Sequence, residues 1–86
     1  MPDALDTRRR RAAYRAAHRG TKEMDIMLGR FADVMLPSLI DPHLHRFEVF
    51  ISLPDPELQG WLLQPGRIAG LEFEGLIADV RKFHGL

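Results

Sequence analysis

The sequence predicts an all-α fold, a single small five-helix bundle. Its apolar residues recur at steps of three and four, and no segment sustains the alternation typical of a strand. Two Asp-Pro pairs, at residues 41–42 and 55–56, are typical of helix starts. A length of 86 residues allows one domain, and 45% hydrophobic with 28% charged residues is typical of a folded chain. We expect a flexible segment at residues 1–6 and one helical domain at residues 7–86.

The first expected helix is rich in arginine and alanine and covers about residues 7–18. Gly20 interrupts it and is expected as the left-handed residue that follows a helix C-terminus. Thr21 is a suitable N-cap for the second helix. Glu23 and Asp25 then supply negative charge to its first turn, where the helix dipole favours it.

The second helix carries an apolar stripe, and Pro37 ends it because the residue before a proline avoids the α conformation. The stripe consists of Met24, Met27, Leu28, Phe31, Val34 and Met35. Asp41 and Asp55 are the expected N-caps of the third and fourth helices. Pro42 and Pro56 follow them at the first helical positions, where a missing N–H costs no hydrogen bond.

The remaining helices also have apolar positions that predict a core. A turn at residues 64–67 (QPGR) separates the fourth helix from the last, which is expected from about Leu71. The expected core residues are Leu44, Phe47, Phe50 and Ile51 in the third helix, Leu58, Trp61 and Leu62 in the fourth, and Phe73, Leu76, Ile77, Val80 and Phe83 in the last.

The net charge is zero but unevenly distributed: residues 1–22 carry +5 and residues 23–86 carry −5. This pattern suggests a basic N-terminal arm on an acidic body. The lack of cysteine excludes disulfides and thiolate metal sites. No apolar run approaches the roughly 20 residues that span a bilayer, and no secretory signal is evident. We expect a complete bacterial protein of the cytoplasm, without membrane insertion.

The four arginines of residues 8–11 raise nucleic-acid binding as an alternative function, because guanidinium groups attract phosphates. Four consecutive helical residues point around the whole helix, however, and the acidic body would repel a phosphate backbone. We favour a solvated arm, or an arm that docks on an acidic protein surface. A generic helical protein-interaction module is a further alternative.

Independent catalysis is not expected. His43 and His45 lie two residues apart, so on a helix they lean toward different faces and are expected as exposed side chains rather than metal ligands. No Gly-rich phosphate loop, P-loop lysine or serine nucleophile beside a base is evident. The sequence therefore predicts no catalytic residue, no metal site and no cofactor held stably by the chain itself.

The segment RGTKEMD, residues 19–25, allows two interpretations. In the structural one, Arg19 ends the first helix, Gly20 and Thr21 connect the helices, and Arg19 pairs with Glu23 across the connection. In the functional one, Gly20 leaves the backbone uncovered, so that a partner can approach between a guanidinium and a carboxylate. Local physics favours the structural interpretation without excluding the other.

This segment also resembles a family signature. RGTKEMD fits the R-G-x-x-E motif of the SdhE family, also called succinate dehydrogenase assembly factor 2 or flavinator proteins. The tyrosine in an Arg-rich first helix, the aromatic residue in GRF, the DPEL turn with Trp61 three residues after Leu58, and the closing apolar helix also match. The resemblance covers about residues 8–83.

The resemblance implies an assembly factor that binds the flavoprotein subunit of succinate dehydrogenase, or of fumarate reductase. Such a factor promotes covalent attachment of FAD to that subunit, and the flavoprotein carries the chemistry. By the motif match, Arg19, Gly20 and Glu23 are the implied partner-binding residues, with Asp25 a nearby candidate. We expect a monomer, and apolar Met and Phe side chains leave a dimer open.

Overall fold

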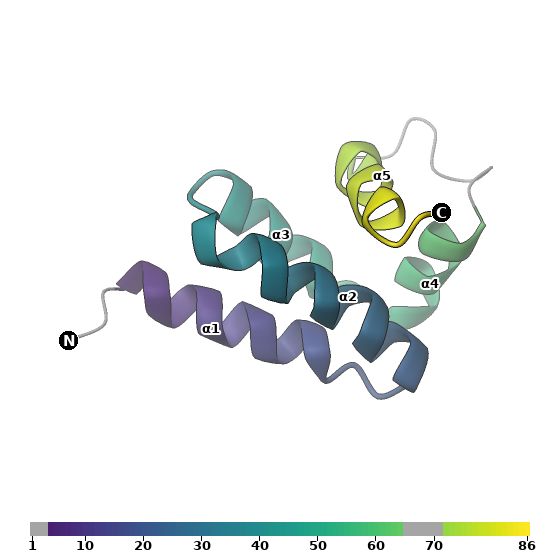
Figure 1. Cartoon of the computed structure of the whole chain (residues 1–86), viewed down its shortest axis with the longest axis horizontal. Helices are drawn as coiled ribbons and strands as arrows, with labels where there is room; N and C mark the ends of the chain where they lie inside the picture. Colours follow the sequence, from purple (N-terminus) through teal and green to yellow (C-terminus); the bar gives the residue numbers. More distant parts are fainter. Residues whose placement is uncertain (1–3, 65–71) are drawn as a thin grey trace.

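The computed structural model describes residues 4–64 and 72–86, and these residues form α-helices without any strand (Figure 1). This confirms the all-α prediction. The helices are α1 (Ala4–Ala17), α2 (Lys22–Met35), α3 (His43–Ile51), α4 (Asp55–Leu63) and α5 (Glu74–Phe83), with a 3₁₀ turn η1 (Leu36–Ser38) after α2. No helix in the described ranges is long and apolar enough to cross a membrane.

Helices α1 and α2 lie antiparallel and side by side, and they make the most extensive helix contact in the fold (Figure 1). Small residues allow this close approach. Ala12 and Ala16 of α1 are buried, and a Cβ added to Gly29 of α2 would lie 3.0 Å from the Cα of Ala17. A larger residue at position 29 would therefore force the two backbones apart.

Aromatic side chains connect α2, α3 and the start of α5 through the core. The ring of Phe47 lies 6.0 Å from that of Phe31 and 6.5 Å from that of Phe50, and Phe50 lies 5.4 Å from Phe73. The core prediction is confirmed for α3, whose four named residues are all buried. The other buried large side chains include Met24, Leu28, Leu36, Leu58, Leu62, Ile77 and Val80, while Trp61 is half-buried.

The end of α2 departs from the expected stripe. Val34 is 61% exposed and Met35 is 40% exposed, whereas Ala32 and Leu36 are buried. Because α1 packs against the side of α2 that carries Gly29 and Ala32, the buried stripe follows that side. Val34 is two residues from Ala32, about 200° around the helix, and so faces solvent.

Several helix boundaries also differ from the expectation. Helix α1 begins at Ala4, so residues 4–6 form its first turn rather than a flexible segment. Helix α5 begins at Glu74 instead of Leu71; residue 71 and residues 65–67 of the expected turn at 64–67 lie outside the described residues.

The prediction that Thr21 caps α2 is confirmed: its Oγ1 accepts a hydrogen bond from the N–H of Met24 at 3.3 Å.

The helix at the first Asp-Pro pair starts one position later than expected, and the helix at the second pair starts one position earlier. Pro42, not Asp41, is the N-cap of α3, although Asp41 Oδ1 still accepts a hydrogen bond from the N–H of His45 at 3.2 Å. Asp55 is the first residue of α4 rather than its N-cap. In both cases the aspartate carboxylate also binds an arginine from elsewhere in the chain.

Candidate partner-binding site

Arg19 lies in the connection between α1 and α2, and its side chain points into the protein. The guanidinium binds one carboxylate and two main-chain carbonyls. Asp55 Oδ1 accepts from Nε at 2.9 Å and lies 2.7 Å from Nη2. The carbonyl oxygens of Ile51 and Leu53 accept from Nη1 and Nη2 at 2.5 and 3.1 Å. With only 10% of the side chain exposed, Arg19 ties this connection to the segment between α3 and α4.

Asp25 holds the same connection from the side of α2. Its Oδ1 accepts a hydrogen bond from the main-chain N–H of Arg19 at 2.5 Å. The carboxylate therefore fixes the backbone of the residue whose side chain reaches Asp55. We call residues 18–25 the α1–α2 joint; within it, Arg19 and Asp25 are the two half-buried motif residues that bind other parts of the chain.

Gly20 and Glu23 face outward from this joint. Gly20 has a φ of +113°, confirming the predicted left-handed backbone, but it lies three residues beyond the end of α1 rather than directly after it. No atom lies within 4 Å of a Cβ added there. Glu23 is exposed and forms no hydrogen bond or ion pair with any described residue. The expected Arg19–Glu23 pair is therefore wrong, because Asp55 takes the guanidinium.

The structure thus divides the four predicted site residues between two locations. Arg19 and Asp25 form the inner side of the joint, and Gly20 and Glu23 form part of its outer surface. Asp55 and the carbonyls of Ile51 and Leu53 were not anticipated as partners of Arg19. The DPEL turn was the available signal, but a separation of 36 residues along the chain gives no indication of pairing.

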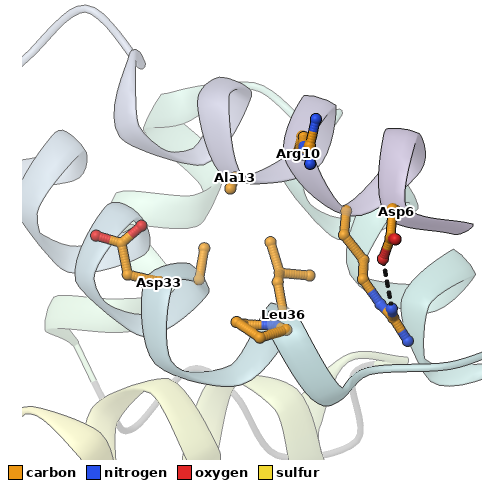
Figure 2. Close-up of a pocket in the computed structure, with 8 residues that line it drawn as sticks. Asp6, Arg10, Ala13, Asp33 and Leu36 are labelled. Atoms are coloured by element: carbon orange, nitrogen blue, oxygen red, sulfur yellow. Dashed lines mark hydrogen bonds and ion pairs between the residues drawn. The ribbon is translucent and has the colours of Figure 1, made fainter. Parts of the chain in front are cut away.

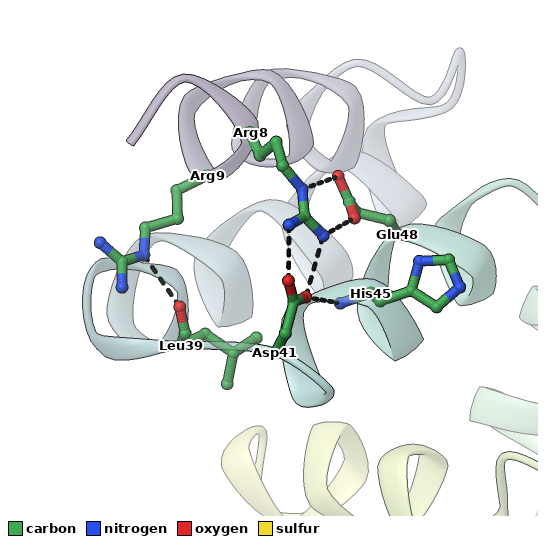
Figure 3. A network of polar contacts seen from close by, with 6 residues as sticks. All are labelled: Arg8, Arg9, Leu39, Asp41, His45 and Glu48. Atoms are coloured by element: carbon green, nitrogen blue, oxygen red, sulfur yellow. Dashed lines mark hydrogen bonds and ion pairs between the residues drawn. The ribbon is translucent and has the colours of Figure 1, made fainter. Parts of the chain in front are cut away.

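At its other end, α1 is held by a second arginine network (Figure 3). Arg8 Nη1 and Nη2 donate to the two carboxylate oxygens of Asp41 at 2.7 and 2.9 Å, and Nη2 and Nε donate to Glu48 at 2.6 and 3.3 Å. Asp41 and Glu48 raise the pKa of Arg8 above its ordinary value. The hydrogen bond from Arg8 in turn lowers the pKa of Asp41.

Arg9 is also bound within the protein. Its Nε donates to the carbonyl of Leu39 at 2.9 Å, and its Nη1 lies 3.0 Å from Asp6 Oδ1. The expected solvated basic arm is therefore wrong for these two residues, since Arg8 and Arg9 attach α1 to the body. Arg10 and Arg11 are exposed, as a solvated segment would require.

An open groove of about 330 Å³ lies between α1 and the end of α2 (Figure 2). Ala13, Ala32, Leu36 and Pro37 line its apolar part. Asp33 lies at one end, and the Asp6–Arg9 pair lies at the other (Figure 2). These polar groups do not converge on one point, and Arg9 is already bound, so the groove lacks the arrangement that orients a cofactor.

Possible metal ligands are not grouped in the described part of the chain. His43 and His45 are both exposed, as predicted. Across residues 4–64 and 72–86, no group of three or more His, Asp or Glu side chains is placed to hold an ion. The described residues therefore offer no candidate metal centre.

Comparison with known proteins agrees with the resemblance suggested by R-G-x-x-E. The chain is 43% identical over 60 residues to an FAD assembly factor SdhE of Acetobacter pasteurianus, a match that covers 70% of this chain and 55% of that protein. It is 26% identical over 80 residues to a mitochondrial succinate dehydrogenase assembly factor 2 of Dictyostelium discoideum, which covers 93% of this chain and 56% of the relative. A protein of the same name from Meyerozyma guilliermondii is 34% identical over 59 residues, 69% of this chain and 44% of its own.

The chain thus spans about half the length of the curated relatives that it matches. No solved structure matches it. The profile of a protein family described as Sdh5, flavinator of succinate dehydrogenase, matches residues 10–84 and includes the whole α1–α2 joint. The chain therefore belongs to the flavinator family of succinate dehydrogenase assembly factors.

Proposed function

We propose that this protein binds the flavoprotein subunit of succinate dehydrogenase, or of fumarate reductase, and promotes covalent attachment of FAD to it. Membership of the flavinator family supports this, as do the names of the relatives, which are assembly factors rather than catalysts. A bacterial relative supports a bacterial origin, and we propose the cytoplasm as the compartment. The alternative of a nucleic-acid-binding arm loses support because Arg8 and Arg9 bind within the protein.

The proposed mechanism is selective binding rather than catalysis by the chain. A protein accelerates another protein's reaction when it binds the productive conformation more tightly than the others. The flavoprotein would supply the chemistry that joins FAD to its own side chain. This protein would hold the flavoprotein in the conformation that allows that step, without binding FAD stably itself.

The observation that carries the proposal is the outer surface of the joint. Glu23 is an exposed acidic side chain with no bonding partner in the described residues. Beside it, Gly20 exposes main chain that no side chain covers. Arg19 and Asp25 fix this surface in place from below, which lowers the entropy cost of binding.

The direct test is covalent flavinylation of the partner. The apo-flavoprotein subunit is incubated with FAD, with and without this protein, and then acid-precipitated; the flavin fluorescence of the washed protein reports covalent attachment. We expect the fluorescence to increase only when this protein is present. Equal fluorescence in both samples, or turnover of free FAD by this protein alone, would contradict the proposal.

Salt dependence tests whether charge contributes to the contact. Exposed charges are screened beyond about 8 Å at physiological ionic strength, so the affinity for the flavoprotein should fall as salt is added. A titration of Kd between low and high sodium chloride measures this. An affinity independent of salt would argue against charged residues of the joint as a main contact.

A further inference from the structure

The outer face of α1, together with the first residue of the joint, carries four exposed side chains. They are Arg11, Tyr14, Arg15 and His18, and we call them the α1 stripe. Steps of three and four residues place them on one side of the helix. Tyr14 is 66% exposed, the largest exposed fraction among the exposed large hydrophobic residues of the described chain.

Tyr14 is held in a fixed orientation although it is exposed. Its ring stacks on the imidazole of His18, with centroids 4.0 Å apart and planes inclined by 20°. The Nδ1 atom of His18 lies 2.8 Å from the carbonyl oxygen of Tyr14, which holds the imidazole in turn. An aromatic side chain fixed in this way loses little conformational entropy on binding.

The charges of the stripe are uncompensated within the described residues. Arg8 and Arg9 bind carboxylates, but neither Arg11 nor Arg15 forms a hydrogen bond or ion pair there. Lys22 of the joint is also exposed and unpaired in the same ranges. The stripe therefore carries two unpaired positive charges next to a joint whose exposed charges are Lys22 and Glu23, while residues 23–86 carry a net −5.

We propose that the α1 stripe docks on an acidic surface patch of the flavoprotein, with Tyr14 as its anchor and Arg11 and Arg15 as its charged flanks. This inference rests on the proposed function and extends its contact surface beyond the R-G-x-x-E motif. Tyrosine and arginine are the residues that most often dominate binding energy at protein interfaces. Charge complementarity determines which partner surface they select and speeds association.

A protein surface fits the stripe better than a nucleic acid does. Residues 11–18 extend only about 10 Å along the helix, at 1.5 Å per residue, which is too short to follow many phosphates. One face of the Tyr14 ring is already covered by His18, so a base has less surface on which to stack. The acidic body beyond the stripe would also repel a longer phosphate backbone.

The test uses two pairs of matched variants and measures the Kd for the apo-flavoprotein subunit by calorimetry. Tyr14→Ala is compared with Val34→Ala, which truncates another exposed apolar residue on α2. Arg15→Glu is compared with Lys82→Glu, which makes the same charge change at an exposed position of α5. We expect Tyr14→Ala to weaken binding by about tenfold or more and Arg15→Glu by at least several-fold. Both controls should bind as the wild type does.

Each other outcome overturns a defined part of the account. If the wild type binds and all four variants bind equally well, the stripe is not the contact, while the proposed function stands. If the wild type does not bind the flavoprotein, both are wrong. Two further outcomes would show that the stripe has another occupant. The protein binds a 20-nucleotide RNA, or it self-associates and Arg15→Glu abolishes the self-association. If flavoprotein binding is not lost in parallel, the RNA or a second copy of the chain, and not the flavoprotein, occupies the stripe.

Discussion

Two arginines, one in the first turns of α1 and one just after its end, attach this segment to the two ends of α3 and their neighbouring residues, but they do so in different environments. Arg8 binds two carboxylates, one just before α3 and one within it, and 32% of its side chain is exposed. Arg19 binds one carboxylate at the start of α4 and two main-chain carbonyls at and just after the end of α3, and only 10% is exposed. Similar residues with similar hydrogen bonds should therefore contribute differently to stability.

The difference follows from what each arginine leaves behind when it is removed. Without Arg8, Asp41 is 52% exposed and solvated by water, and the 26% exposed Glu48 is partly solvated, but no main-chain carbonyl loses a donor. Without Arg19, the carbonyls of Ile51 and Leu53 and the carboxylate of Asp55 lose a donor in a half-buried position. The R-G-x-x-E motif thus combines a structural arginine with an exposed glutamate.

The largest expected effect is that of Arg19→Ala. We expect it to lower the free energy of unfolding by about 2–4 kcal/mol, because it leaves several partly buried polar groups unpaired. Urea denaturation followed by circular dichroism measures this. Arg8→Ala is the comparison and should destabilise clearly less. Equal losses for the two variants would contradict the contrast between the two networks.

Arg19→Lys sharpens the same comparison. A lysine keeps the charge but cannot direct donors from a planar guanidinium to Asp55 and to two carbonyls at once. We expect most of the loss seen for Arg19→Ala to persist in this variant. If Arg19→Lys is as stable as the wild type in the same denaturation experiment, charge alone explains the role of Arg19.

The next effect in size is that of Gly20→Ala. The φ of +113° is rarely adopted by residues with a side chain, so we expect a loss of about 1–2 kcal/mol. Open space around position 20 means that this cost is conformational and not steric. Gly60→Ala is the matched control, because it lies inside α4 and also meets no neighbouring atom. The control should gain up to about 1 kcal/mol in urea denaturation, and a gain at position 20 as well would contradict the structure.

The smallest effect is expected at the exposed network and depends on pH. Because Arg8 lowers the pKa of Asp41, the carboxylate stabilises the folded state above its ordinary pKa of 3.8. This stabilisation should be complete above about pH 5 and should disappear as pH falls through the lowered folded-state pKa. Denaturation curves of the wild type and Asp41→Asn from pH 7 to pH 3 should therefore converge toward low pH. A difference that stays constant would exclude this ion pair as its source.

The sequence predicted the helices well because each has a local signal. The apolar positions of α3, the Thr21 cap and the left-handed Gly20 all depend on neighbouring residues, and the structure confirms them. The same local signals failed where distant residues compete. Asp55 was expected to cap its own helix and Glu23 to pair with Arg19, but Arg19 and Asp55, 36 residues apart, bind each other instead.

The sequence predicted where the candidate site lies, but not which of its residues face into the protein and which face outward. RGTKEMD identified the joint, whereas the direction of each side chain depends on the packing of α1 against α2 and α3. The close contact at Gly29 and the hydrogen bonds of Arg8 to α3 set that packing. Neither has a signal in the local sequence, so the roles of Arg19 and Glu23 could not be separated beforehand.

The central claim is that Glu23 contacts the partner while Arg19 maintains the fold, and one paired measurement tests it most directly. Glu23→Gln and Glu57→Gln each neutralise an exposed glutamate in the first turn of a helix, so each should change stability by less than about 0.5 kcal/mol. Their Kd values for the apo-flavoprotein subunit are then compared with that of the wild type. We predict that Glu23→Gln weakens binding by about tenfold or more and that Glu57→Gln does not. Wild-type affinity for a stably folded Glu23→Gln variant would contradict the claim.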